Sequence, residues 1–294
     1  MREPRLPPGR ELELPGRGTT FVRELPPPPG APTLFLLHGW MASADLNWFA
    51  VYPELVGRFG VVTIDHRGHG RGIRSRRRFR LEDCADDAAA ALDELGIDSV
   101  IGVGYSMGGP IAQLLWRRHH DRVDGLVLCA TSRNFAGSPM AKATFSMFPT
   151  IALAGRVTPA TVRQRAMERM MVRRNGGDST WFHRESMRND PIKLAEAGGA
   201  IGRFTSHEWI GEVDVPTAIV ITEQDSVIPA HRQEKLARAV PGATVHRVPG
   251  DHTVCATEPH LFVPVFRDAC ASVSARVRVR RSSSAPVDPD PLPT

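Results

Sequence analysis

The chain has 294 residues, of which 41% are apolar, and a formal net charge of +5. This length suits one large α/β domain with an insertion, or two small domains. The sequence contains no run of about 18 apolar residues, so we predict no transmembrane helix. The charged, proline-rich start lacks the apolar segment of a secretory signal, and we therefore expect a cytoplasmic protein.

Cysteine and arginine usage argues against a structural metal site and against a nucleic-acid-binding protein. The four cysteines are widely spaced and form no Cys-x-x-Cys pair, which favours a reduced protein without structural zinc or another metal site. Arginines cluster over 74–80 and 276–281. Because no aromatic-interleaved RNA motif accompanies them, we interpret both clusters as solvated surface and expect no nucleic-acid partner.

Strands and helices alternate through the first half of the chain. After a proline-rich start that we expect to be disordered over 1–10, residues 11–14 and 19–24 predict a hairpin at a sheet edge. Apolar runs predict buried strands, and amphipathic stretches predict helices. The strands are 33–37, 61–64, the run from Val100, and 123–130; the helices are 48–56, 81–95 and the segment after Ser106. This pattern predicts a mainly parallel, doubly wound α/β sheet with helices on both faces.

The segment around Ser106 combines a strand, a sharp turn and a helix. The run from Val100 leads into Gly-Tyr-Ser-Met-Gly, and a helical pattern follows at once. A turn this tight strains the backbone at the serine and leaves no room for side chains two positions away, so glycine is expected at 104 and 108. The serine hydroxyl is then exposed at the top of the sheet. Taken alone, the pattern also fits a phosphate-binding Gly/Ser loop.

The sequence pattern changes between residues 133 and 212. Strand-like runs disappear, and helix-length stretches rich in methionine and arginine replace them. The segment is too long for an ordinary loop, so we predict a helical cap between core segments 11–132 and 213–275. The α/β pattern resumes with strands at 215–222 and 244–248 and helices at 230–240 and 260–273. Residues 276–294 are expected to form a disordered tail.

Partners for Ser106 follow the later strands. A serine hydroxyl needs a base within hydrogen-bond reach and a third group that orients the base. In doubly wound sheets such groups lie at the carboxyl ends of strands. Asp225 and His252 each follow one of the two strands after the cap. We therefore predict Ser106 as nucleophile, His252 as base and Asp225 as the orienting acid.

Other acids and histidines fit these roles less well. Glu223 shares the loop of Asp225 and is the second choice for the acid. Asp251 is too close in sequence to His252 to reach back to its ring easily. His38 also lies near a strand end, where we expect it to hold its own loop through backbone hydrogen bonds.

An oxyanion formed at Ser106 needs donors aimed at it. The backbone N–H of Met107 opens the following helix and has no partner inside it. The N–H of Trp40, in His38-Gly39-Trp40, is the expected second donor, with Gly39 allowing close approach. The side chains that we expect to line the substrate pocket are Trp40, Tyr105, Met107, Met140 and Met147.

Taken in order, these motifs resemble the α/β-hydrolase superfamily over about residues 10–275. The matching segments are 38–40, 65–70, 104–109, the loop with Asp225, and 250–252. The chain is similar to bacterial esterases, lactonases and perhydrolases that use no cofactor, and the resemblance implies an α/β-hydrolase fold and a Ser-His-Asp triad. Relatives that open epoxides or displace halide use aspartate at position 106, so we expect neither reaction. Arg71-Gly72 departs from the small serine of many relatives, in a structural loop.

The leading hypothesis is a serine hydrolase that cleaves carboxylic esters through an acyl-enzyme. The methionine-rich cap predicts an adaptable pocket, hence a small apolar ester as substrate. The same triad serves lactonases, carbon–carbon bond hydrolases, perhydrolases and acyltransferases, so these reactions stay open. The alternative that is not an enzyme is a non-catalytic protein of the same fold that binds a ligand.

Overall fold

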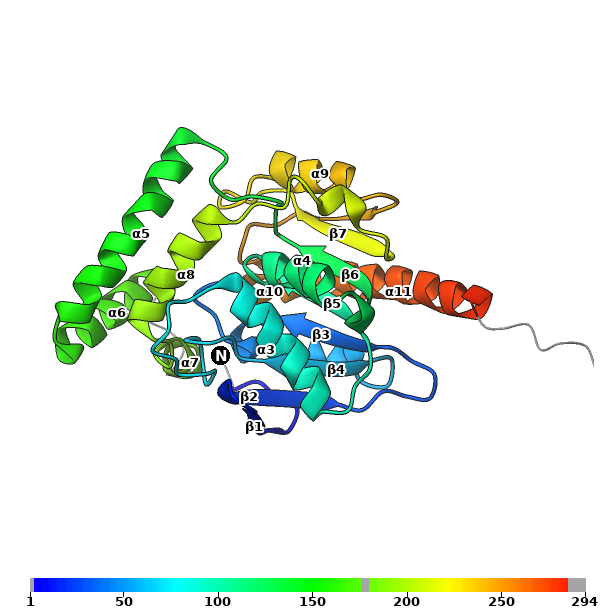
Figure 1. Cartoon of the computed structure of the whole chain (residues 1–294), viewed down its shortest axis with the longest axis horizontal. Coiled ribbons are helices and arrows are strands. Elements are labelled where there is room, and N and C mark those ends of the chain that lie inside the picture. The colour runs from blue at the N-terminus through cyan, green and yellow to red at the C-terminus, as the bar shows by residue number, and fades with distance from the viewer. Residues whose placement is uncertain (1–2, 176–179, 285–294) are drawn as a thin grey trace, which may run out of the picture.

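The structure, a computed structural model, describes residues 3–175 and 180–284. Its centre is a sheet in the order β1-β2-β4-β3-β5-β6-β7-β8 (Figure 1). The strands are β1 (Gly9–Leu14), β2 (Gly18–Leu25), β3 (Thr33–Leu37), β4 (Gly60–Ile64), β5 (Val100–Tyr105), β6 (Val123–Cys129), β7 (Thr217–Thr222) and β8 (Thr244–Val248). Strand β2 is antiparallel to β1 and β4, and the other neighbours are parallel, which confirms the predicted sheet and its edge hairpin.

Helices cover both faces of the sheet, as predicted. They are α1 (Ala44–Trp48), α2 (Tyr52–Leu55), α3 (Leu81–Glu94), α4 (Gly108–Arg118), α9 (Ala230–Ala239), α10 (Val254–Thr257) and α11 (Pro259–Ser284). One apolar cluster joins the sheet to α3, α4 and α9, and a second joins it to α1, α2, α10 and α11. Strand β3 serves both clusters, since Phe35 and Leu37 face the first while Leu34 and Leu36 face the second.

The pairing of the parallel strands brings the loops that follow them to one edge of the sheet. Leu37 lies opposite Gly104, so the loop after β3 lies beside the turn after β5. Tyr105 lies opposite Cys129, which places the end of β6 on the other side of that turn. The turn with Ser106 is therefore flanked by residues that follow β3 and β6.

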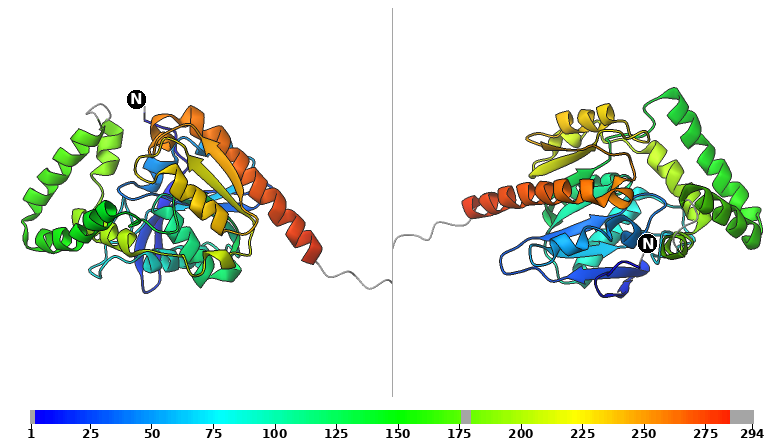
Figure 2. Two further views of the ribbon diagram at one scale, coloured as in Figure 1. Left: turned by 90° about the horizontal axis from the view of Figure 1, so that it is seen from above. Right: turned by 180° about the vertical axis from the view of Figure 1, so that it is seen from behind.

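Among the described residues, four α-helices lie between β6 and β7, within the segment predicted as a cap. They are α5 (Pro139–Val157), α6 (Ala160–Asn175), α7 (Thr180–Ser186) and α8 (Pro191–Arg203). We call α5–α8 the helical insertion. Helix α8 packs against the core through Ala197, Ala200 and Ile201, and α5 lies beside α8 and contacts the core cluster through the half-buried Phe145 (Figures 1 and 2). The division of the chain into core and cap domains at 133 and 212 stays a prediction.

Two predicted helices differ from the structure. The helix expected over 48–56 is two short helices, α1 and α2, and begins earlier because the Ser43 side chain caps it by accepting a hydrogen bond from the Leu46 N–H. Helix α11 continues to Ser284, where we expected a disordered tail from 276. Its apolar face persists through the buried Val277, which explains the extension (Figure 2). Residues 285–294 lie outside the described ones.

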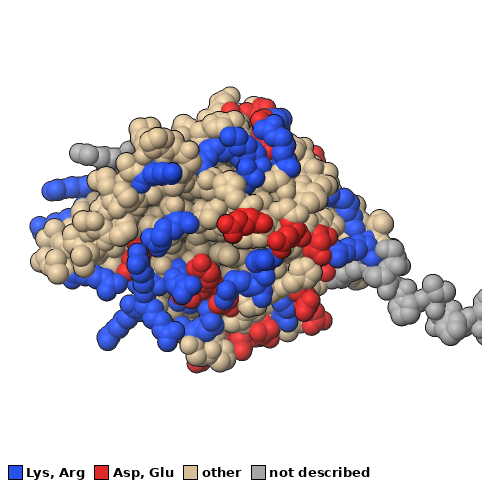
Figure 3. All heavy atoms as spheres, turned by 45° about the horizontal axis from the view of Figure 1, so that its top comes forward, with Lys and Arg blue, Asp and Glu red and all other residues tan. Residues whose placement is uncertain are grey.

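The arginine clusters are partly solvated and partly tethered. Arg76, Arg77, Arg78 and Arg80 are exposed, as expected. Arg276 instead donates to the carbonyl oxygens of Thr217 and Gly242, tying α11 to the sheet. On the face drawn in Figure 3, many Lys and Arg lie toward the helical insertion and others at the opposite end, whereas most Asp and Glu lie away from the insertion. Within the described ranges, every helix is too short or too polar to cross a membrane.

Candidate active site

Ser106 lies in a strained turn between β5 and α4. Its φ is 52°, in the left-handed region that residues other than glycine rarely adopt. A Cβ on Gly104 would lie 2.2 Å from the carbonyl oxygen of Gly108, and a Cβ on Gly108 would lie 2.0 Å from that of Leu37. Both positions therefore need glycine, as the sequence predicts.

Hydrogen bonds from β6 hold this turn in place. The N–H of Ser106 donates to the carbonyl of Cys129 at 3.0 Å. The hydroxyl of Thr131 donates to the carbonyl of Ser106 at 2.8 Å. The N–H and the carbonyl of Ser106 are thus both held by residues at and just after the end of β6.

The three residues predicted as a triad lie in one hydrogen-bonded chain. The Oγ of Ser106 is 2.9 Å from Nε2 of His252, and Nδ1 of His252 is 2.7 Å from Oδ2 of Asp225. Since the carboxylate only accepts, Nδ1 carries the proton and leaves Nε2 free to accept from the serine. The Asp225 side chain is fully buried, and that of His252 is 14% exposed.

Asp225 is held by four further donors. Its Oδ1 accepts from the N–H groups of Val227 and Ile228, at 2.9 and 2.7 Å. Its Oδ2 accepts from the hydroxyl of Thr222 at 2.7 Å and from the amide of Gln233 at 3.3 Å. Sequence reasoning missed Gln233, a fully buried residue of α9, because polar side chains outnumber apolar ones on this helix and no pattern marks Gln233 as the one that is buried.

The structure places Tyr105 differently from our expectation of a pocket-lining residue. Its side chain is buried against Trp48 and Phe262, and its hydroxyl donates to the backbone carbonyl of His252 at 2.9 Å. Burial raises the pKa of this phenol well above its usual value, so it stays a donor. We therefore assign Tyr105 to holding the His252 loop.

The alternative acids and the alternative histidine have other partners. Glu223 lies 3.6 Å from the guanidinium of Arg247, and Asp251 accepts from the N–H of Thr253. His38 contacts the carbonyl of Gly39 through Nδ1 and accepts from the N–H of His66 through Nε2. The expectation that His38 holds its loop through backbone hydrogen bonds is confirmed.

The two predicted oxyanion donors come from the loop after β3 and from the residue that follows Ser106. Gly39 donates to Oδ1 of the buried Asn47 at 2.8 Å, and a Cβ on Gly39 would lie 3.4 Å from Cβ of Ser106. Among the described residues, neither the N–H of Trp40 nor that of Met107 donates to another protein group. Both N–H groups are available for an oxyanion, and that role stays a prediction.

The predicted pocket residues lie in contrasting environments. Trp40 is half-buried; its indole N–H donates to the carbonyl of Leu194 in α8, and its ring contacts Phe148 edge-on. The side chain of Met107 is fully buried in the core. Met140 and Met147 lie on α5 with 80% and 61% of their surfaces exposed. Of these side chains, only that of Trp40 bridges the loop after β3 and the helical insertion.

Three fully buried histidines lie where the loops after β3 and β4 meet. The ring of His38 is 4.2 Å from that of His66 and 5.5 Å from that of His69. Burial lowers the pKa of His38 to about 4 and that of His69 to about 3, and it lowers the pKa of His66 well below its usual value. All three rings are therefore neutral in the folded protein near pH 7.

We expect the buried histidines to make the protein sensitive to acid. Below pH 6.5, their ordinary pKa, the unfolded chain binds protons that the folded chain does not. The free energy of unfolding should therefore be maximal above pH 6.5 and fall as the pH drops toward 4, by up to about 1.4 kcal/mol per pH unit for each histidine. Urea unfolding between pH 7.5 and 5 measures this slope.

A pair of variants isolates the contribution of the histidines. His66→Phe should flatten the slope, whereas replacement of the exposed His260 by asparagine should leave it unchanged. An equal slope in wild type and His66→Phe would show that this buried ring does not contribute.

Comparison with known proteins matches most of the chain to one family. A family model described as alpha/beta hydrolase fold matches residues 32–259. Epoxide hydrolase B of Mycobacterium tuberculosis is 35% identical over 126 residues, which cover 41% of this chain and 35% of that protein. The first curated relatives are thus matched over about a third of their own length.

Two further proteins match over more of their length. Pimeloyl-[acyl-carrier protein] methyl ester esterase of Chromobacterium violaceum is 28% identical over 228 residues, covering 74% of this chain and 85% of that one. The solved structure of a thermophilic esterase from Thermogutta terrifontis superposes with a TM-score of 0.71 at 23% identity, covering 91% of this chain and 99% of that one. The structural likeness is one of fold.

Proposed function

The chain belongs to the α/β-hydrolase family, and we propose that it is a serine hydrolase that cleaves carboxylic esters through an acyl-enzyme. The proposal rests on one observation above all, the continuous chain of hydrogen bonds from Ser106 through His252 to Asp225. Such a chain converts a weakly nucleophilic hydroxyl into one whose proton is removed as it attacks.

The reaction follows from this geometry. The Oγ of Ser106 attacks the ester carbonyl carbon while Nε2 of His252 takes its proton, and Asp225 stabilises the resulting imidazolium through Nδ1–H. The backbone N–H groups of Met107 and Trp40 donate to the oxyanion. His252 then protonates the leaving alcohol. Water, deprotonated by His252, releases the acid and restores Ser106.

The residue at position 106 favours ester cleavage over epoxide opening. The relative from Mycobacterium tuberculosis is named as an epoxide hydrolase, but family members with that reaction use an aspartate nucleophile, whereas this chain has serine. A serine oxygen attacks a carbonyl carbon and becomes the ester oxygen of the acyl-enzyme, while the alcohol of the substrate leaves. The relative from Chromobacterium violaceum is named as an ester hydrolase, which agrees with this chemistry.

The substrate that we propose is a small apolar ester. Between the loop after β3 and the helical insertion, Trp40, Met41 and Met187 pack against Met167 and Leu194. Such surroundings favour acyl or aromatic groups, and methionine adapts to several shapes.

A p-nitrophenyl ester series from acetyl to long acyl chains, combined with fluorophosphonate labelling, tests the proposal. We expect hydrolysis that depends on chain length, and stoichiometric labelling that mass spectrometry assigns to Ser106. A Ser146→Ala variant, altered on the exposed surface of α5, should behave as wild type. Labelling without hydrolysis of any ester would exclude a simple esterase. Absence of both would favour a non-catalytic binding protein.

A further inference from the structure

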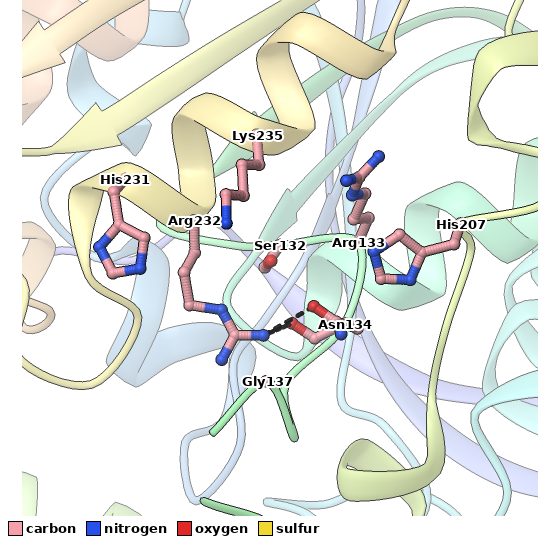
Figure 4. Close-up of a pocket in the computed structure, with 8 residues that line it drawn as sticks. All are labelled: Ser132, Arg133, Asn134, Gly137, His207, His231, Arg232 and Lys235. Atoms are coloured by element: carbon pink, nitrogen blue, oxygen red, sulfur yellow. Dashed lines mark hydrogen bonds between the residues drawn. The ribbon is translucent and has the colours of Figure 1, made fainter. Parts of the chain in front are cut away.

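A basic pocket lies where the helical insertion joins the core. It is formed by the connection from β6 to α5, the connection after α8, and α9 (Figure 4). The residues that line it are Ser132, Arg133, Asn134, Gly137, His207, His231, Arg232 and Lys235. The lining thus holds three permanent cations and two histidines but no carboxylate.

The positive charge of this basic pocket is not neutralised by neighbouring acids. Within the part of the chain that the structure describes, Arg133, Arg232 and Lys235 form no ion pair. The acid of α9, Glu234, lies instead 3.0 Å from the guanidinium of Arg247 and 3.9 Å from that of Arg238. Burial lowers the pKa of Arg232, with no carboxylate to oppose it. An anion entering the pocket would therefore meet cations that no carboxylate neutralises.

The Arg232 side chain is held in a fixed orientation. Its Nη1 donates to the carbonyl of Phe135 at 3.0 Å, and its Nη2 donates to the carbonyl and the side-chain oxygen of Asn134 at 2.6 and 2.7 Å. These neutral acceptors orient the guanidinium without cancelling its charge. His231 and Lys235, four residues apart on α9, flank it, while Arg133 and His207 lie side by side opposite (Figure 4).

We propose that the basic pocket binds a phosphate group, either as inorganic phosphate or as a phosphate monoester. Convergence of several cationic donors suits a doubly charged anion with three or more oxygens better than a single carboxylate. This proposal is independent of the proposed esterase activity, because it uses none of the residues assigned to the triad.

The location of the basic pocket gives a bound phosphate a structural consequence. The two connections of the helical insertion meet here, through a bridge between Asn134 and Thr205 and a bond from the N–H of Ser206 to the carbonyl of Arg133. Helix α9 supplies the opposite wall. Phosphate would therefore tie both connections to α9.

Isothermal titration at constant ionic strength tests the site with two probes, inorganic phosphate and glycerol 3-phosphate. We expect saturable binding that weakens at least about tenfold in Arg133→Gln and in Lys235→Gln. The matched control is Arg238→Gln, which removes the same charge from α9 at an exposed position outside the pocket and should bind as wild type. Thermal unfolding of each variant verifies that its fold is retained.

The two probes separate the sources of the phosphate. Binding of inorganic phosphate alone supports a site for the free ion, and binding of glycerol 3-phosphate as well supports a site for a phosphate-bearing molecule. The proposal is overturned if neither probe binds at millimolar concentration. Equal affinity in wild type, Arg133→Gln and Lys235→Gln would overturn it too.

Discussion

Replacing Ser106 with alanine is expected to lower kcat for ester hydrolysis by at least about 10⁴-fold while the fold persists. The substitution removes the attacking oxygen, and no other hydroxyl is hydrogen-bonded to Nε2 of His252 among the described residues. Alanine adds no new backbone strain, because serine already occupies the left-handed conformation there. Steady-state kinetics give kcat, and thermal unfolding verifies the fold.

Variants of the other two triad residues supply the comparison. His252→Ala should be about as severe as Ser106→Ala, because the serine then lacks its base. Asp225→Ala should cost less in kcat, since the base remains and loses its orienting partner. Ester hydrolysis at an undiminished rate by folded Ser106→Ala protein would refute the assignment of the nucleophile.

Gly108→Ala should remove activity and lower the free energy of unfolding by roughly 3 kcal/mol or more. The new methyl carbon would lie 2.0 Å from the carbonyl oxygen of Leu37 and 3.0 Å from that of His38. Both contacts are with backbone, which cannot rotate away as a side chain can. Relief requires α4 to separate from the end of β3, which displaces both predicted oxyanion donors. Urea unfolding and ester kinetics measure the two effects.

Gly211→Ala is the matched control for this substitution. Gly211 has an ordinary backbone conformation, and an added Cβ would meet its nearest atom at 3.7 Å, an ordinary contact. We expect its unfolding free energy to stay within about 0.5 kcal/mol of wild type. If Gly108→Ala were as stable and active as Gly211→Ala, the close packing of α4 against β3 would not be essential.

The parts of the fold that could be predicted are those that short stretches of the sequence determine. The sequence predicts the strand Thr33–Leu37 at its observed bounds. A short run of large apolar residues between polar ones favours a buried strand, because it is too short for a buried helix. The turn at Ser106 was predictable because steric crowding demands glycine at 104 and 108. The proximity of Asp225 and His252 could be predicted because the carboxyl ends of parallel strands lie at the same edge of a sheet.

The parts that could not be predicted depend on contacts between distant segments. Tyr105 and His252 are 147 positions apart, and nothing in the composition around Tyr105 reveals which carbonyl its hydroxyl meets. The same holds for Gln233, whose burial depends on how α9 packs against the loop with Asp225. The C-terminal helix was predicted too short because its later turns are rich in arginine. One of these arginines, Arg276, instead donates from its guanidinium to the carbonyl of Thr217, which holds this part of α11 against the sheet.

Trp40 connects the loop beside Ser106 to the helical insertion. Its main chain lies in the loop beside Ser106, and its indole N–H donates to the carbonyl of Leu194 in the helical insertion. On the proposed mechanism, the segment that selects the substrate and the group that stabilises its transition state are therefore joined through one residue. A change in the helical insertion that shifts Leu194 would therefore also shift the backbone of Trp40, and grafting an insertion from a relative would have to preserve an acceptor for this indole.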